Sequence, residues 1–252
     1  MSLLVDQWVG KLAVVTGASA GIGAAITKAL VEAGINVVGL ARRVEKVQEI
    51  SKQLINPKGE LYAIKCNVTD ESDVKKAFEE IEKIGIVHIL INNAGALLNT
   101  TLYNGNVDDW RNVLETNVMG PCIVSKEVIK IMSSNKVAGQ IINMNSILGH
   151  FVYDIPNTNI YTASKHALRA LTETLRLELI GVESKIKVTS LSPGPVEETD
   201  FFIRNIMGGD GKSPLKYFLK PEDVANGVLY ILSTPPHFQV AELMLRPVGE
   251  PF

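Results

Sequence analysis

The sequence predicts one α/β domain with a doubly wound, parallel β-sheet that has helices on both faces. Short β-branched runs alternate with longer amphipathic stretches along the chain, which is typical of repeated βαβ units. Most of the short runs are apolar throughout, as strands are when helices cover both sides of a sheet. The chain has 252 residues and no repeat, low-complexity tract or linker, so we expect a single domain over residues 1–252.

Six segments are predicted strands because each is short, rich in β-branched residues and poor in charge. Their regular alternation with helices implies parallel strands joined by right-handed crossovers. The predicted strands are Leu12–Thr16, Asn36–Leu40, Leu61–Cys66, Val87–Ile91, Gln140–Met144 and Lys187–Leu191.

Two of the intervening helices have clear sequence signals. Between Ile22 and Ala33 apolar residues recur every three or four positions, and Gly34 supplies a stop. A second stripe of the same period belongs to a helix that begins near Tyr161, runs to Leu179 and is followed by Gly181. Both patterns predict amphipathic helices that pack one face against the sheet.

The least regular segment lies between Pro193 and Lys220. It is rich in Gly and Pro but also contains many large apolar side chains. A loop of this composition is unusual unless something apolar covers it, so we expect a substrate lid around residues 195–220. The apolar residues are Phe201, Phe202, Ile203, Ile206, Met207, Tyr217 and Phe218, of which Phe201 and Phe202 are predicted substrate contacts.

Composition excludes several classes of protein. The formal net charge is −2 and the isoelectric point about 6.1, without the basic excess of proteins that bind nucleic acids or membrane surfaces. No run reaches about 18 uninterrupted apolar residues, and the N-terminal residues do not resemble a signal peptide. We therefore expect a cytoplasmic protein without stable membrane insertion. Cys66 and Cys122 have no metal-ligand spacing and are predicted to be reduced, buried thiols, so no metal site is expected.

A glycine-rich turn, Thr16–Gly23, connects the first predicted strand to the first predicted helix. Glycines in this position permit a tight turn, close approach of the backbone to a pyrophosphate, and close packing of helix on strand. The helix N-terminus then presents free N–H groups and a positive dipole end to the phosphates. The turn therefore predicts a dinucleotide site with contacts from Gly17, Ser19, Gly21, Ile22 and Gly23.

The same residues allow a hydrolase interpretation. Gly17–Gly21 also matches G-x-S-x-G, which would make Ser19 a nucleophile with a later His237 as its partner. That elbow normally follows several strands, whereas this turn follows the first, so the dinucleotide interpretation is favoured. Labelling of Ser19 by a fluorophosphonate would reverse that choice.

Two arginines follow the second predicted strand and indicate which dinucleotide binds. An acidic residue near this position usually binds the ribose 2′-OH of NAD, but here the chain has Arg42 and Arg43. A guanidinium can bind a 2′-phosphate through two hydrogen bonds. An Arg pair in the first turn of a helix would oppose the helix dipole, which makes a phosphate partner more plausible. The sequence therefore predicts NADP(H).

A tyrosine and a lysine four residues apart predict the chemistry. Tyr161 and Lys165 share one helix face, so both can point into the same site. A phenol is a poor base at neutral pH, and a nearby ammonium should lower its pKa. Ser146 follows a buried strand at the sheet edge where ligands bind, and its hydroxyl could polarise a substrate oxygen. Together they predict proton transfer to or from an alcohol or carbonyl oxygen.

Taken in order, these motifs resemble the short-chain dehydrogenase/reductase family over nearly the whole chain. The matching motifs are Thr16–Gly23, Asn92–Gly95, Asn117, Ser146, Tyr161–Lys165 and Pro193-Gly194. The resemblance implies a Rossmann-type sheet of about seven strands and a homodimer or homotetramer. It also implies that Tyr161 is the acid/base, Lys165 binds the nicotinamide ribose, Ser146 orients the substrate and Asn117 holds a water in a proton relay. Implied cofactor contacts are Asn67, Val68, Asn93, Ala94, Gly95, Pro193, Gly194 and Val196.

Two segments, Gly39–Arg43 and Ser146–His150, with a long gap before Tyr161, are similar to a farnesol dehydrogenase-like branch of the family. This branch is akin to the vertebrate family member 11, which acts on steroids. That resemblance implies a small apolar alcohol or carbonyl substrate, a farnesol-type isoprenoid alcohol or a ketosteroid; the alternative is a general reductase of small ketones and dicarbonyls. A nucleotide-binding regulator without turnover is a further alternative. Two residues depart from the family pattern. Asn67 stands where many relatives carry Asp, and Thr199 lies one residue later than the Thr of the usual PGxVxT run. The expected substrate contacts are Ser146, Leu148, His150 and Tyr153.

Overall fold

The computed structural model describes residues 4–156, 158–197 and 216–250. In these ranges the chain forms a seven-stranded sheet in the order β3-β2-β1-β4-β5-β6-β7, and every neighbouring pair is parallel. The strands are β1 Leu12–Thr16, β2 Asn36–Ala41, β3 Leu61–Lys65, β4 Val87–Asn92, β5 Gln140–Met144, β6 Lys187–Pro193 and β7 Glu242–Leu245. All six predicted strands are therefore confirmed, and the doubly wound α/β fold with them.

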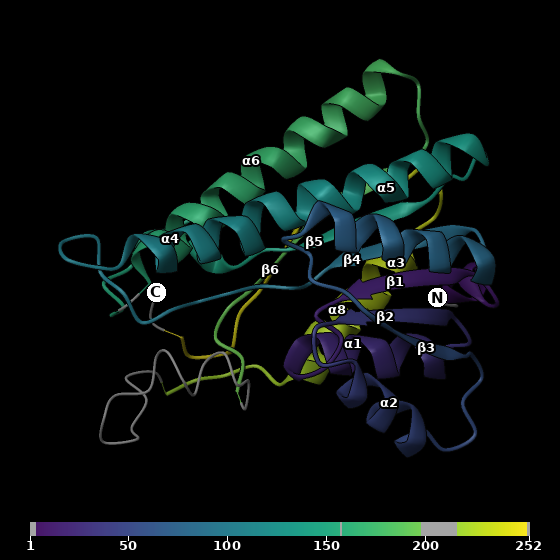
Figure 1. Cartoon of the computed structure of the whole chain (residues 1–252), viewed down its shortest axis with the longest axis horizontal. Helices are drawn as coiled ribbons and strands as arrows, with labels where there is room; N and C mark the ends of the chain where they lie inside the picture. The colour runs from purple at the N-terminus through teal and green to yellow at the C-terminus, as the bar shows by residue number, and fades with distance from the viewer. Residues whose placement is uncertain (1–3, 157, 198–215, 251–252) are drawn as a thin grey trace.

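Helices cover both faces of the sheet (Figure 1). The helices α1, α2 and α8 lie on one face and α3, α4, α5 and α6 on the other. Their bounds are α1 Gly21–Glu32, α2 Val44–Gln53, α3 Glu71–Ile84, α4 Val107–Leu114, α5 Gly120–Ser134, α6 Asn159–Gly181 and α8 Pro221–Leu232. Three short helical turns complete the described elements: η1 Leu4–Trp8, η2 Glu115–Met119 and η3 Ile147–Gly149.

The alternation of side chains along β1 explains why the sheet needs both helical layers. Ala13 and Val15 belong to the apolar core with α1 and α8, whereas Leu12 and Val14 belong to the core with α3 and α5. All of β1 is buried, as expected for a central parallel strand. The strand order reverses between β1 and β4: β2 and β3 lie on one side of β1, and β4 to β7 lie on the other. In such sheets ligands bind in the crevice outside the carboxyl ends of the strands at this point.

Two local predictions were wrong. Arg42 and Arg43 precede α2 rather than occupying its first turn, because the helix begins at Val44. Cys122 is exposed rather than buried, because it lies on the outer side of α5, whose inner side packs Val124 and Val128.

Cys66 is buried as predicted, and burial raises the pKa of its thiol to about 12. Both cysteines are free thiols. None of the helices within the described ranges has the length and apolar composition needed to cross a membrane.

Candidate active site

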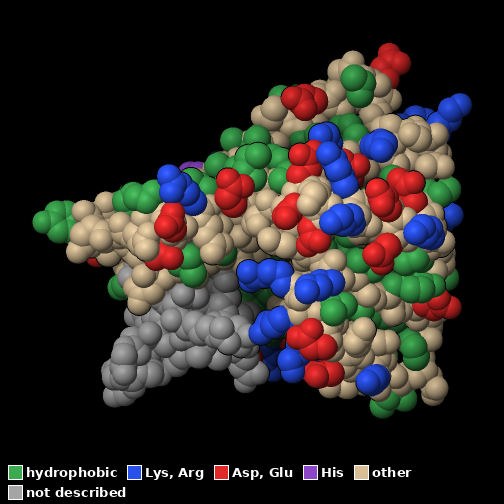
Figure 2. All heavy atoms as spheres, viewed as in Figure 1, with side chains coloured by type: hydrophobic (Ala, Val, Ile, Leu, Met, Phe, Trp, Pro, Cys, Tyr) green, Lys and Arg blue, Asp and Glu red, His purple; other side chains and the backbone are tan. Residues whose placement is uncertain are grey.

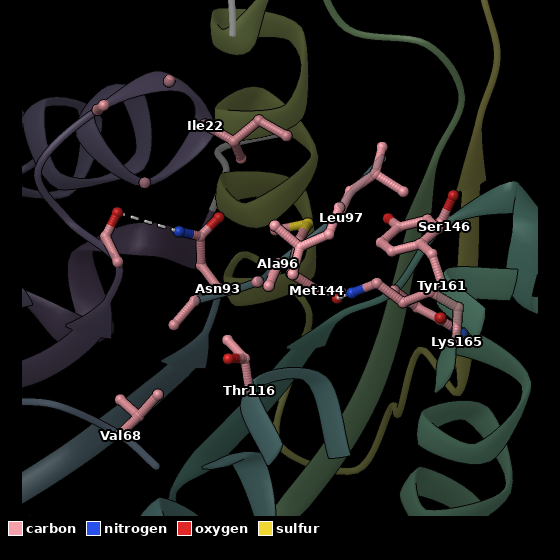
Figure 3. Close-up of a pocket in the computed structure, with 18 of the residues that line it drawn as sticks. Ile22, Val68, Asn93, Ala96, Leu97, Thr116, Met144, Ser146, Tyr161 and Lys165 are labelled. Carbon is pink, nitrogen blue, oxygen red and sulfur yellow. Dashed lines mark hydrogen bonds between the residues drawn. The ribbon is translucent and has the colours of Figure 1, made fainter. Parts of the chain in front are cut away.

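One cavity of about 1030 Å³ lies at the carboxyl edge of the sheet and gathers most of the predicted site. In Figure 3, Ser146, Tyr161 and Lys165 lie together at one side of the pocket, and Val68 and Asn93 lie at the other. Parallel strands make this possible, because their carboxyl ends all meet at one edge. The predicted residues that line the cavity are Gly17, Ser19, Gly21, Ile22, Gly23, Arg42, Arg43, Asn67, Val68, Asn93, Ala94, Gly95, Ser146, Leu148, Tyr161, Lys165, Pro193, Gly194 and Val196.

Other predicted residues lie elsewhere. Asn117 is buried beside the cavity, while His150 and Tyr153 are not among the described residues that line it. Thr199, Phe201, Phe202 and most of the predicted lid lie outside the described residues.

Several lining residues were not predicted from the sequence. Leu98 and Ile155 add apolar surface, Arg111 adds a cation, and Asn145 adds a buried amide. Each lies in a segment whose sequence pattern does not indicate a ligand site. Leu97 belongs to the same wall and lies in the loop after β4, whose sequence carries no clear signal.

The glycine turn is held against the end of β4 by reciprocal hydrogen bonds. The Thr16 hydroxyl accepts from the backbone N–H groups of Asn93 and Ala94, both at 2.9 Å. In return the Asn93 amide donates to the carbonyl oxygens of Thr16 (2.9 Å) and Gly17 (3.3 Å). These bonds fix the two turns that border the centre of the cavity.

The turn itself is shaped for an anion. Gly17 has a φ of +67°, and a Cβ on this residue would lie 2.9 Å from the Ala94 Cα. The residue before α1 is Ala20, which provides no side-chain cap, so the first N–H groups of the helix are left for a ligand. Figure 2 shows Lys and Arg side chains gathered on the face between α2 and α3. Arg42 and Arg43 add positive charge to the lining of the cavity. These features fit a dinucleotide phosphate.

Asn117 clamps the loop that follows β4. It lies in η2, a π-helical turn between α4 and α5. Its Oδ1 accepts from the Ala96 N–H at 2.7 Å, and its Nδ2 donates to the Ala96 carbonyl oxygen and the Ser164 hydroxyl, each at 2.9 Å. Since Ser164 precedes Lys165 on α6, one amide joins the cavity wall to α6.

Ser146, Tyr161 and Lys165 form the polar end of the cavity. The Ser146 hydroxyl accepts from the Leu148 N–H at 3.1 Å and hydrogen-bonds the Tyr161 side chain. The Lys165 Nζ donates to the Met144 carbonyl oxygen at 2.8 Å and lies 5.6 Å from the centre of the Tyr161 ring. The three side chains are therefore close enough to act on one substrate oxygen.

Burial shifts the pKa of the two titratable groups in opposite directions. It raises the pKa of Tyr161, against which the hydrogen bond from Ser146 acts in the lowering direction. It lowers the pKa of Lys165 to about 7. The sequence led us to expect that Lys165 would lower the pKa of Tyr161. In the structure, burial is the larger influence on Tyr161, and its direction is opposite.

The lowered pKa of Lys165 has a consequence for stability. Between pH 7 and about 10.4 the unfolded chain carries a proton on this lysine that the folded chain has lost, so this group makes stability rise with pH. We expect Lys165→Met to raise the melting temperature most below pH 7, with the gain shrinking as pH approaches 10. Thermal unfolding of both proteins from pH 6 to 9.5 measures this; a pH-independent difference would contradict it.

The hydrolase interpretation does not fit the placement of its residues. Ser19 lies at the carboxyl edge of the sheet, lining the cavity. His237 adjoins Phe238, whose carbonyl oxygen accepts from the Nζ of Lys187, the first residue of β6. The histidine therefore lies at the opposite edge of the sheet from Ser19. In the described parts of the chain, no cluster of three or more His, Cys, Asp or Glu side chains forms a metal site.

Comparison with known proteins supports the family that the sequence motifs resemble. A family model described as short chain dehydrogenase matches residues 11–206. The chain is 48% identical over 251 residues to a farnesol dehydrogenase of Aedes aegypti, covering 98% of this chain and 100% of that protein. It is 39% identical over 254 residues to the human dehydrogenase/reductase SDR family member 11, covering 98% and 97%.

Solved structures agree in fold. Serine dehydrogenase in its closed form with NADP⁺ matches with a TM-score of 0.86 and 29% identity, over 96% of each chain. An alcohol dehydrogenase from Thermococcus sibiricus with 5-hydroxy-NADP matches with a TM-score of 0.81 and 28% identity, over 95% of this chain and 97% of the other. With a family match over most of its length and a relative at nearly half identity, the chain belongs to the short-chain dehydrogenase family and is an oxidoreductase.

Proposed function

We propose that this oxidoreductase uses NADP(H) to interconvert an alcohol and an aldehyde or ketone on an apolar substrate, such as a farnesol-type isoprenoid alcohol or a ketosteroid. The observation that carries the proposal is the convergence of Ser146, Tyr161 and Lys165 at one end of a cavity whose other end is a glycine-rich phosphate cradle. The similarity to a farnesol dehydrogenase supports the substrate class.

The residues of the chain account for the proton chemistry. In reduction, the Tyr161 hydroxyl donates its proton to the substrate oxygen; in oxidation, the phenolate accepts it. The Ser146 hydroxyl holds that oxygen, since it already faces the Tyr161 side chain. The Lys165 ammonium stabilises the phenolate by its charge. Bound NADP(H) would supply or accept the hydride.

An apolar wall lies beside the polar group of Ser146, Tyr161 and Lys165 in the cavity. Leu97, Leu148 and Tyr161 belong to one buried cluster, against which Ile155 and Leu98 pack. All five side chains also line the cavity. An apolar wall beside the acid/base favours a substrate whose hydroxyl or carbonyl is attached to hydrocarbon.

Arg42 and Arg43 account for the choice of cofactor. Both are exposed at the end of β2 and line the cavity, where they would bind the 2′-phosphate. We expect Arg42→Ala and Arg43→Ala each to lower kcat/KM with NADPH about ten- to a hundredfold, which corresponds to about 1.5–3 kcal/mol for a hydrogen bond to a charged group.

The same two substitutions should leave kcat/KM with NADH nearly unchanged. Arg169→Ala is a matched control, because Arg169 is an exposed residue of α6 that does not line the cavity. Steady-state kinetics with both cofactors make the comparison. A wild type that uses NADH as well as NADPH would refute the NADP(H) assignment.

A substrate panel tests the reaction itself. Farnesol with NADP⁺, and farnesal, ketosteroids and α-dicarbonyls with NADPH, separate the proposal from its alternative, a general carbonyl reductase of small ketones and dicarbonyls. Turnover of the isoprenoid or steroid substrates supports the proposal. Efficient reduction of dicarbonyls alone supports the alternative.

We also propose a cytoplasmic homodimer or homotetramer. Large apolar side chains are exposed along η2 and α6, among them Met119, Leu177 and Ile180. Such a surface on a helical layer is suited to association with a second copy. Size-exclusion chromatography with light scattering measures the mass directly.

A further inference from the structure

We infer that Glu242, the first residue of β7, is a positioning residue that fixes the place of Ser146 by holding both ends of the segment that carries it. The inference rests on the proposed function, in which Ser146 orients the substrate oxygen. Glu242 lies on the last strand of the sheet and is not among the described residues that line the cavity. Its effect must therefore pass through other side chains.

The hub of the arrangement is one carboxylate oxygen. The Glu242 Oε1 accepts from the hydroxyls of Ser190 (3.0 Å) and Ser192 (2.6 Å), both on the neighbouring strand β6. The His150 Nε2 lies 3.3 Å from the same oxygen. Because an ionised carboxylate can only accept hydrogen bonds, both serine hydroxyls must donate to it.

That direction sets the rest of the network. Because the Ser190 hydroxyl donates its proton to Glu242, its oxygen accepts from the Asn145 Nδ2 at 3.3 Å. In the same way Ser192 accepts from the His150 Nε2 at 3.0 Å, which places the ring proton on that nitrogen. Asn145 directly precedes Ser146, and His150 directly follows η3. One carboxylate thus orders the donors at both ends of the Asn145–His150 segment.

The segment between these two ends is short and tightly packed. The Ser146 hydroxyl accepts from the Leu148 N–H, so its rotamer is tied to the backbone of η3. A Cβ on Gly149 would lie 2.6 Å from the Asn145 Oδ1, so the residue before His150 lies close against the Asn145 side chain. A displacement of either end would therefore be passed to Ser146.

The partners of Glu242 are buried, although its own side chain is 31% exposed. Ser190 and Asn145 are 2% and 3% exposed, and Ser192 is fully buried. In such surroundings hydrogen bonds strengthen and a hydroxyl without an acceptor is penalised. This position also explains why His150, predicted as a substrate contact, turns its ring toward β6 and β7. We assign it to the same positioning network.

Two substitutions of Glu242 test the inference. Glu242→Leu removes the acceptor, whereas Glu242→Gln retains one acceptor oxygen at the same length. With saturating NADPH we expect Glu242→Leu to lower kcat about ten- to a hundredfold, the range expected when a reacting group is misplaced. The dissociation constant for NADPH should stay within about twofold of the wild type. Glu242→Gln should recover most of kcat.

A readout that needs no turnover accompanies the kinetics. Hydrogen–deuterium exchange in Glu242→Leu should become faster in residues 145–151 and stay unchanged in the glycine turn, residues 16–23. Glu79→Leu, an exposed glutamate on α3, is the matched control and should change neither kcat nor exchange.

Three outcomes would overturn the inference. In Glu242→Leu, kcat and hydrogen–deuterium exchange could equal those of the wild type, or NADPH affinity could fall in parallel with kcat. In Glu242→Gln, kcat could fail to recover. The proposed function fails separately, if the wild type turns over no substrate of the panel with NADPH or NADP⁺. In that case the exchange experiment alone still decides whether Glu242 holds the Ser146 segment.

Discussion

Replacing Tyr161 with phenylalanine should reduce kcat by about 10²–10⁴-fold, the range that general acid–base catalysis contributes. The substitution removes only the hydroxyl, which hydrogen-bonds Ser146 in the polar group at one end of the cavity. The ring would remain packed in its cluster with Leu97 and Leu148. The melting temperature and the dissociation constant for NADPH should therefore change little.

Stopped-flow hydride transfer, monitored by NADPH absorbance, measures the step directly. Tyr230→Phe on α8 is the matched control, because Tyr230 is half-exposed and does not line the cavity. If Tyr161→Phe retained the kcat of the wild type with any accepted substrate, the proposed proton transfer would be wrong.

The second large effect is expected from Gly23→Ala, in the turn that we propose holds the cofactor phosphates. A Cβ at this position would lie 2.3 Å from the Gly17 carbonyl oxygen and 2.4 Å from the Asn93 Nδ2. Neither atom is free to move, since Gly17 forms the tight turn and Asn93 donates to it. Accommodating the methyl group must displace the turn, at about 1–3 kcal/mol of stability.

The same displacement should weaken NADPH binding at least about tenfold, equivalent to about 1.4 kcal/mol. Fluorescence titration with NADPH and thermal unfolding report the two effects. Gly181→Ala, at the end of α6, is the control, because a Cβ there would have nothing within 4 Å. A Gly23→Ala protein that binds NADPH as the wild type does would contradict the role of this turn.

The sequence was sufficient to predict the sheet because buried parallel strands are apolar on both faces. It also predicted many of the residues that line the cavity, since residues after parallel strands gather at one edge, but not the placement of His150 and Tyr153. The strand β7 was not predicted from its own pattern: it is four residues long and begins with the exposed Glu242. Pattern arguments fail for an edge strand of this length, whose place is decided by pairing with β6.

The fine structure of the site depends on contacts that spacing alone does not reveal. Nothing in the sequence indicates that the Asn117 amide binds both backbone groups of Ala96, or that His150 turns toward Ser192. The pKa of Lys165 likewise depends on how deeply α6 buries it. Such features depend on tertiary packing, so they require the folded coordinates.

The residues proposed to choose the dinucleotide and those proposed to transfer the proton come from different parts of the chain. The turns after β1 and β2, with Gly17 and Arg42, line the end of the cavity where we propose that the dinucleotide binds. Ser146, Tyr161 and Lys165 all come from the part of the chain after β4. If these proposed roles hold, the preference for NAD or NADP can diverge in evolution without a change in the proton-transferring residues. We expect exchange of the first seventy residues with those of a relative to transfer the relative's dinucleotide preference and to retain Ser146, Tyr161 and Lys165.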